Sequence, residues 1–191
     1  MFDTDNLIAE CRDAIKESDP RKAVREVLLR TLERPGDVAD ALARKEGGLD
    51  IIHCTDELTV LNAVWAPHMN LLPHDHRMWA VIGIYGGTED NSFYRRADDG
   101  IEQAGGRELH QSEVIALGVD AIHSVKNPER IFTGAIHVYG GDFMNQPRSQ
   151  WDPDTLIEKP YDISQIRAEF ARANEAWARE LAERDVDETV Q

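Results

Sequence analysis

Apolar residues recur every three or four positions over about the first 45 residues, which is the spacing of one face of a helix. The residues with this spacing are Leu7, Ile8, Cys11, Ile15, Val24, Val27, Leu28 and Leu32. Asp19-Pro20 and Pro35-Gly36 interrupt the pattern, and pairs of this kind end helices. The N-terminal part of the chain, residues 1–45, is therefore predicted to be helical.

From about residue 49 to residue 145 the pattern changes to short apolar runs separated by turn residues. The runs cover residues 58–65, 78–85, 114–117 and 132–139. Pairs such as Gly86-Gly87 and Gly140-Gly141 lie between or after them. Short strands with regular turn signals are typical of a sandwich or barrel, so this part is predicted to be a β-barrel.

Helical spacing returns near the C-terminus. The apolar residues that show it are Ile166, Phe170, Ala173, Trp177 and Leu181. Such a stripe is most simply a packing face, and it predicts a helix over about residues 164–184 with Ser164 as its N-cap. Because no linker or internal repeat is apparent, residues 1–191 are interpreted as a single, mainly β domain with helices at both ends.

Composition favours a folded, globular protein, and the excess of acidic residues is most simply explained by solubility. Hydrophobic residues make up 41% of the chain, and the net charge of −15 would repel nucleic acids and anionic membranes. Neither is therefore expected as a partner. Cys11 and Cys54 are too few for a disulfide framework, and acidic residues interrupt the apolar positions that a signal peptide would need. We expect a cytoplasmic protein.

His74 and His76 form the strongest chemical signal in the chain. On an extended strand, residues two apart point to the same face, so the two imidazoles make half of a metal site. His123 is the best candidate for a third ligand. Imidazole binds iron, zinc, copper and nickel, so the ligand type alone does not name the metal. Ordinary surface or core histidines are the alternative interpretation.

Two motifs resemble those of the cupin superfamily, whose members carry His-x-His in a first motif and His-x-x-x-Asn in a second. This chain has His74-x-His76 and His123-x-x-x-Asn127. Within cupins it is similar to thiol dioxygenases, the group of cysteine dioxygenase and 3-mercaptopropionate dioxygenase. The similarity extends over roughly residues 58–153 and includes the segments 72–76, 93–96, 122–128 and 136–142.

This resemblance implies a cupin double-stranded β-helix, or jelly-roll barrel. It also implies an Fe(II)-dependent enzyme that adds O2 to a small thiol, 3-mercaptopropionate or cysteine, to give a sulfinate. In this interpretation His74, His76 and His123 hold the Fe(II), and the partners are the thiol and O2.

The stretch after the His pair departs from the pattern of many cupins, which place a Glu there. Here it is Met78-Trp79-Ala80-Val81. Three neutral ligands leave a metal its full positive charge, and an anionic thiolate can offset that charge. This favours a three-His iron site for thiols over a site with two His and one carboxylate. A three-His site with a water ligand would also suit zinc hydrolysis.

His137 and Tyr139 share a strand face and are the candidate catalytic residues. In the thiol dioxygenases that this chain resembles, a Ser-x-His-x-Tyr array lies beside the iron, and its Tyr hydroxyl hydrogen-bonds substrate or oxygen. The Ser position is Ala135 here, and its side chain cannot hydrogen-bond the imidazole. The alternative is that His137 and Tyr139 are half-buried barrel residues.

Arg148 is the candidate substrate-binding residue. A thiol with a carboxylate needs a cation, and the Arg fork pairs with both carboxylate oxygens. Bacterial 3-mercaptopropionate enzymes have such an Arg after the Tyr motif, and Arg148 occupies a similar place. Arg95 and Arg96 are competing candidates, and any of the three could be a solvated surface residue.

Two other functions stay open on the sequence alone. One is a different metal-dependent cupin enzyme, such as an isomerase or a dioxygenase of substrates that are not thiols. The other is a non-catalytic cupin that binds a small molecule in its barrel. Oxygen uptake with a panel of thiols separates a thiol dioxygenase from another cupin enzyme, and an empty metal site would favour the non-catalytic protein.

Overall fold

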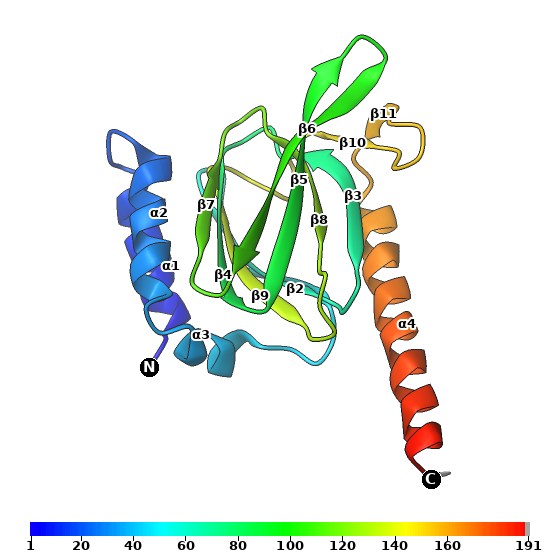
Figure 1. Cartoon of the computed structure of the whole chain (residues 1–191). Coiled ribbons are helices and arrows are strands. Elements are labelled where there is room, and N and C mark those ends of the chain that lie inside the picture. Colours follow the sequence, from blue (N-terminus) through cyan, green and yellow to red (C-terminus); the bar gives the residue numbers. More distant parts are fainter. Residues whose placement is uncertain (190–191) are drawn as a thin grey trace.

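Two antiparallel sheets face each other in the computed structural model, which describes residues 1–189 (Figure 1). Within these residues one sheet has the strand order β1-β2-β9-β4-β7, and the other has the order β11-β10-β3-β8-β5-β6. The strands are β1 (Gly48–Cys54), β2 (Thr59–Trp65), β3 (Asn70–Asp75), β4 (Ala80–Gly86), β5 (Thr88–Ala97), β6 (Gly100–His110), β7 (Val114–Leu117), β8 (Ile122–Lys126), β9 (Thr133–Tyr139), β10 (Ser149–Trp151) and β11 (Glu158–Pro160).

Strands far apart in sequence are neighbours in each sheet, β2 beside β9 and β3 beside β8. This is the arrangement of a double-stranded β-helix, and it confirms the predicted fold class. The strands continue past the predicted barrel end near residue 145, because β10 pairs with β3 at Gln150 and His74. The sequence did not predict β10 and β11, since runs of three residues are too short to show a period.

Helices lie at both ends of the chain, as predicted, and Figure 1 shows them on different sides of the barrel. They are α1 (Thr4–Ala14), α2 (Pro20–Thr31), α3 (Pro35–Leu42) and α4 (Ile163–Thr189). The carboxylate of Asp162 accepts the backbone N–H groups of Ser164 and Gln165 at the start of α4. Asp162, and not the predicted Ser164, therefore caps this helix. Within the described residues, none of the helices combines the length and apolar character that a membrane span requires.

The central strands β2, β4 and β9 are buried on both faces. Their outward residues, such as Val60 and Val138, pack in one hydrophobic cluster with α1, α2 and α3. Their inward residues, such as Leu61 and Ile82, belong to a second cluster inside the barrel, which α4 joins through Phe170. Burial on both faces explains why these strands are nearly continuous apolar runs in the sequence.

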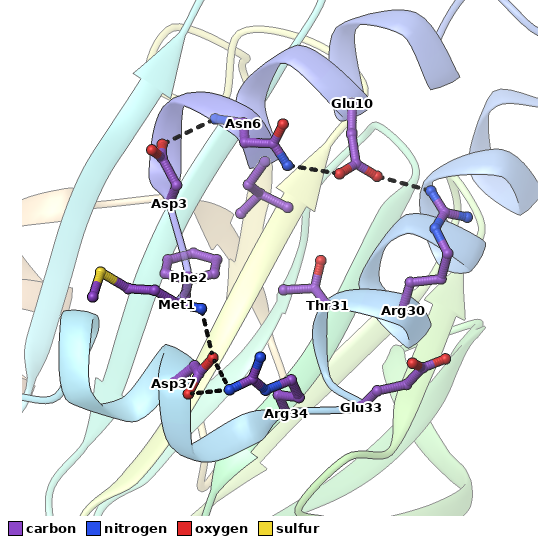
Figure 2. Close-up of a pocket in the computed structure, with 11 residues that line it drawn as sticks. Met1, Phe2, Asp3, Asn6, Glu10, Arg30, Thr31, Glu33, Arg34 and Asp37 are labelled. Atoms are coloured by element: carbon purple, nitrogen blue, oxygen red, sulfur yellow. Dashed lines mark hydrogen bonds and ion pairs between the residues drawn. The ribbon is translucent and has the colours of Figure 1, made fainter.

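A polar hollow of about 490 Å³ lies among the N-terminal helices (Figure 2). The Glu10 carboxylate accepts hydrogen bonds from Asn6 Nδ2 and from Arg30 Nη2, both at 2.8 Å. Arg34 pairs with Asp37 at 3.0 Å. These charges neutralise one another, and the hollow shares no lining residue with the histidine cavity described next. We therefore assign it a role in joining the helices.

Candidate metal centre and active site

The structure brings the three predicted ligands together in the interior of the barrel. His74 lies on β3 directly opposite His123 on β8, and His76 follows the last residue of β3. One ring nitrogen of each lies within 4.8 Å of the other two. The three residues are 6%, 2% and 1% exposed for His74, His76 and His123. This three-His cluster is compatible with a bound metal.

Hydrogen bonds fix the tautomers of two of the imidazoles. His74 Nδ1 lies 3.0 Å from the carbonyl oxygen of Leu72, and His123 Nδ1 lies 2.8 Å from Oδ1 of Asn91. Since both oxygens only accept, each Nδ1 carries the hydrogen and each Nε2 keeps its lone pair. That is the tautomer in which a histidine binds a metal through Nε2.

The electrostatics of the cluster also fit a cation. Burial lowers the pKa of His74 to about 4 and lowers the pKa values of His76 and His123 well below their ordinary value. Neutral imidazoles are the form that binds metals. The Nε2 atoms of His76 and His123 are 3.4 Å apart, a separation that suits two nitrogen ligands of one metal ion at about 2.0–2.1 Å each. The donor set therefore fits a divalent metal ion.

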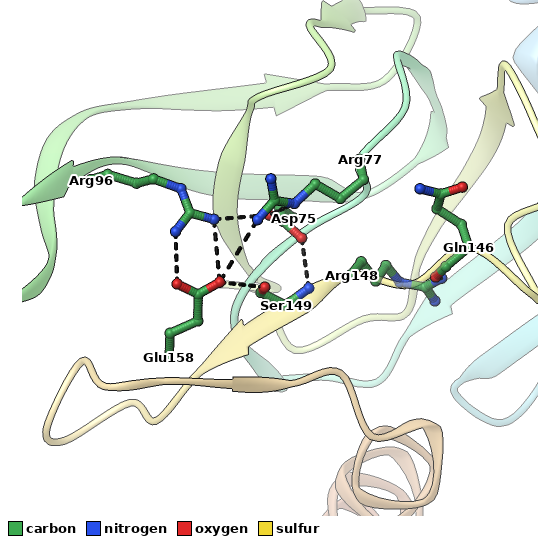
Figure 3. Close-up of polar contacts among 7 residues, drawn as sticks. All are labelled: Asp75, Arg77, Arg96, Gln146, Arg148, Ser149 and Glu158. Carbon is green, nitrogen blue, oxygen red and sulfur yellow. Dashed lines mark hydrogen bonds and ion pairs between the residues drawn. The ribbon is translucent and has the colours of Figure 1, made fainter.

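Asp75 lies between the two histidines in sequence but is not a ligand. Its Oδ1 accepts the backbone N–H of Ser149 at 2.7 Å, and its Oδ2 pairs with Arg77 Nε at 2.6 Å (Figure 3). Arg96 joins the same group, at 3.4 Å from Asp75 and 2.7 Å from Glu158. The network ties the end of β3 to β10 and commits Arg96 to structural ion pairs.

A cavity of about 20 Å³ lies against the three histidines, between the two sheets. Its lining residues are Leu49, Leu61, Trp65, Leu71, His74, His76, His123, Val125, His137, Tyr139, Phe143, Tyr161 and Ile166. A cavity of this size has room for about one water-sized ligand, since a water needs roughly 10–15 Å³. The barrel thus encloses a small, mostly apolar chamber with a few polar groups.

His137 and Tyr139 enter this chamber from β9, in the sheet that faces His74 and His123. The rings of Tyr139 and His76 are 4.9 Å apart, and the Tyr139 hydroxyl lies 2.9 Å from His137 Nδ1. Burial raises the pKa of Tyr139 and lowers that of His137 to about 3, so both groups are neutral near pH 7. The predicted pair therefore lies beside the predicted ligands.

Glu89, on β5, is a site residue that the sequence analysis missed. It is 0% exposed, and its Oε2 lies 3.9 Å from His137 Nε2, an atom without a hydrogen-bond partner in the described part of the chain. Burial raises the pKa of Glu89. His137 therefore faces the carboxyl group of Glu89. Ala135, which precedes His137 by two residues on β9, offers it no hydrogen bond. The spacing of Glu89 and Asn91, two apart on a strand, was the only signal in the sequence.

Gly87 makes the turn that leads into this part of β5. Its φ of +75° lies in the left-handed region that favours glycine, and a Cβ at this position would collide with Thr133. Thr133 Oγ1 donates to the carbonyl oxygen of Thr88 at 2.8 Å and accepts from its N–H at 3.1 Å. This close approach holds the start of β5, and Glu89 with it, against β9.

Arg148 directly precedes β10 and does not itself line the chamber, but it contacts two residues that do. Its guanidinium carbon is 4.1 Å from the ring centre of Phe143 and 3.9 Å from that of Tyr161, and both rings line the chamber. Nη1 donates to the carbonyl oxygens of Phe143 at 2.5 Å and Gln146 at 3.3 Å. Arg148 Nε is buried and has no hydrogen-bond partner among residues 1–189. The competing candidate Arg95 pairs instead with Glu102 on the surface.

Comparison with known proteins gives no family match and only low similarity to solved structures. No protein-family model matches the sequence. Among solved structures, a cupin family protein with a double-stranded β-helix fold from Methanocaldococcus jannaschii shares 9% identity over 53% of this chain and 86% of its own, with a TM-score of 0.46. An uncharacterized protein with a double-stranded β-helix domain from Klebsiella pneumoniae shares 12% identity over 59% of this chain and 87% of its own, with a TM-score of 0.47.

A variant of oxalate decarboxylase from Bacillus subtilis is also similar, at 10% identity over 52% of this chain and 26% of its own, with a TM-score of 0.42. Similarities at these identities, with TM-scores below 0.5, assign neither a family nor an activity to this chain. The strand order and the position of the three histidines are observed directly in this chain. The protein has the double-stranded β-helix fold of cupins, and its interior holds a three-His cluster compatible with a metal.

Proposed function

We propose that the protein is an Fe(II)-dependent dioxygenase of a small thiol such as 3-mercaptopropionate or cysteine. The observation that carries the proposal is the donor set: among the described residues the cluster consists of three imidazoles and includes no carboxylate, and the ring of Tyr139 lies beside it. In the overall reaction one thiol and one O2 give one sulfinic acid, so both oxygen atoms end on sulfur and no other reductant is needed.

We propose a thiol as the substrate because its thiolate would balance part of the charge of the metal ion. A divalent ion held by His74, His76 and His123 alone would keep its full charge in a buried chamber, where an unpaired charge is costly. A thiolate ligand would offset part of this charge and is a soft donor that suits iron. When bound, Fe(II) would supply open coordination positions and electrons for the chemistry of O2.

The residues around the cluster would order the substrate and its protons. Tyr139 keeps its hydroxyl proton at neutral pH because burial raises its pKa, and it can hold that proton near the reacting groups. His137 fixes the direction of this hydroxyl through the 2.9 Å hydrogen bond at Nδ1. Trp65 and Phe143 line the chamber with apolar surface and exclude water.

Arg148 would bind the carboxylate of the substrate. Its Nη1 is held by two carbonyl oxygens, which leaves the Nε edge for a carboxylate. A chamber of about 20 Å³ does not hold a thiol of this size. Some of its lining must therefore move when substrate enters, and Phe143 and Tyr161 are the lining residues whose rings Arg148 contacts. We expect carboxylate binding and opening of the chamber to be coupled.

Oxygen uptake by protein loaded with Fe(II) under anaerobic conditions tests the proposal. We expect 3-mercaptopropionate or cysteine to consume O2 in a one-to-one ratio and to yield a sulfinate that carries both atoms of isotopically labelled O2. Protein loaded with Zn(II) is the control, because zinc has no redox chemistry. Disulfide with hydrogen peroxide as the product would contradict the proposal, and uptake only with substrates that are not thiols would indicate another cupin enzyme.

Metal analysis tests the ligand assignment independently of turnover. Three single variants are compared, in which Ala replaces His74, His76 or His123. Each should lose most of the bound metal and keep the circular dichroism spectrum of wild type. His110→Ala is the matched control, because this exposed histidine pairs with Glu108 on the surface. Wild-type metal content in a variant that lacks all three interior histidines would overturn the assignment.

A further inference from the structure

Glu89 is a fully buried carboxyl group whose position the proposed reaction does not explain. It is 0% exposed on β5, and its contacts are with neutral groups. The indole N–H of Trp65 donates to its Oε2 at 2.7 Å, and Nδ2 of Asn91 donates to its Oε1 at 2.9 Å. Burying such a group is costly unless its hydrogen bonds are satisfied, so the two donors are essential to its placement.

Donor and acceptor roles continue from Glu89 to the candidate metal ligand His123. In the observed hydrogen bonds both oxygens of Glu89 accept, and Asn91 turns its NH2 group toward Glu89 and its Oδ1 the other way. That Oδ1 lies 2.8 Å from His123 Nδ1 and can only accept. His123 Nδ1 therefore carries the hydrogen, and its Nε2 is left with a lone pair directed at the cluster. Each step in this chain leaves only one orientation for the next group.

We propose that Glu89 is a positioning residue of the metal centre, which sets the orientation of the Asn91 amide and through it the metal-binding tautomer of His123. This inference rests on the metal centre of the proposed function but not on the reaction. Asn91 alone would not be sufficient, because an amide can turn over and present NH2 to His123. An acceptor at position 89 prevents this, because a turned amide would place its oxygen against the Glu89 oxygen.

Glu89→Gln tests this chain with almost no change of shape. The new glutamine can accept from only one of Trp65 and Asn91, and the Trp65 indole can only donate. When its oxygen faces Trp65, its NH2 faces Asn91, and the Asn91 amide turns over to accept. The NH2 of Asn91 then points at His123 Nδ1, which favours the hydrogen on Nε2 and blocks the ligand atom.

Metal affinity is the first readout, measured with Zn(II) and Co(II) against a competing chelator. We expect E89Q to lose about ten- to a hundredfold in affinity, the usual effect of a residue that orients a metal ligand. Glu102→Gln is the matched control, because Glu102 is an exposed strand residue paired with Arg95. It should bind both metals as wild type does.

Exchanging the two polar groups should restore the centre. In the double variant E89Q/N91D, a carboxylate at position 91 accepts both from the glutamine at position 89 and from His123 Nδ1. We expect its metal affinity to return most of the way to wild type. The single variant N91D lacks this match of donor and acceptor, because it places the carboxyl groups of positions 89 and 91 in contact. Nitrogen NMR of the metal-free proteins gives a second readout, with the hydrogen of His123 on Nδ1 in wild type and in the double variant, and on Nε2 in E89Q.

The outcomes separate this inference from the proposed function. If E89Q binds metal like wild type and keeps the His123 tautomer, Glu89 does not position the ligand. If E89Q and the double variant are equally weak, Glu89 contributes only packing, and the inference also fails. If the wild-type protein binds neither metal, the proposed metal centre fails as well. A negative result with every thiol, together with the expected affinities, would overturn only the proposed reaction.

Discussion

Replacing Arg148 with Met is expected to remove the preference for thiols that carry a carboxylate. Met keeps much of the volume of the side chain but has neither the charge nor the N–H donors of Arg. In the structure, Nη1 of Arg148 is held by the carbonyl oxygens of Phe143 and Gln146, and the buried Nε is unpaired among the described residues. A carboxylate at the Nε edge would gain charge-assisted hydrogen bonds, and R148M would lose them.

The loss of apparent affinity in R148M has two sources, and a comparison of two substrates separates them. A hydrogen bond with a charged partner contributes about 1.5–3 kcal/mol, which is roughly ten- to a hundredfold in apparent affinity. The stacking of Arg148 on Phe143 and Tyr161 contributes about 0.5–2 kcal/mol per ring, and its loss affects every thiol alike. The ratio of kcat/KM values for two thiols therefore isolates the first effect.

The assay compares 3-mercaptopropionate with cysteamine, a thiol without a carboxylate, on Fe(II)-loaded protein. In R148M we expect the ratio of their kcat/KM values to fall by about ten- to a hundredfold. In R148K it should fall less, because Lys keeps the charge without the fork. Arg95→Met is the control, since Arg95 pairs with Glu102 on the surface. Equal losses for both thiols in R148M would show that Arg148 only supports the two rings.

Three further predictions concern the interior of the barrel. Tyr139→Phe should keep the metal but slow O2 consumption by about ten- to a thousandfold, because a positioned hydroxyl is lost; unchanged turnover in the oxygen electrode would refute its role. Asn127→Ala should lower the free energy of unfolding by about 1–3 kcal/mol in urea titrations while Zn(II) affinity stays constant, because Asn127 Nδ2 donates to the carbonyl oxygens of Ala66 and Ile131 and not to the cluster. Metal-free protein should lose unfolding free energy as the pH falls below about 6.5, because the unfolded chain then takes up protons while burial holds the folded-state pKa of His74 at about 4 and that of His137 at about 3. For His74 the loss approaches roughly 3 kcal/mol near pH 4, at about 1.4 kcal/mol per pKa unit, and a flat pH profile in urea titrations would contradict it.

Local patterns in the sequence predicted the helical ends of the chain, four apolar strands and the ligand pair. Strand parity placed His74 and His76 on one face, and the structure brings both into the cluster with His123. Doubly buried strands such as β9 (Thr133–Tyr139) appeared as apolar runs. Period and parity are properties of neighbouring residues, so they can be derived before the fold is known.

The third ligand needed the family motif as well as the pattern. Nothing near His123 in the sequence relates it to His74, which is 49 positions earlier. The pairing of β3 with β8 places the two residues directly opposite each other. The second cupin motif supported His123 as a ligand in advance, whereas the strand pairing that places it beside His74 came from the structure.

Only the tertiary structure revealed the residues that surround the ligands. Glu89 approaches His137 because β5 and β9 lie in different sheets that face each other. Asn91 reaches His123 because the register of β5 on β8 places their residues together. Arg148 meets Tyr161 through the short strands β10 and β11, which show no period. Such contacts depend on how distant strands pair and on which sheet faces which, and these are decided by the packing of the whole barrel.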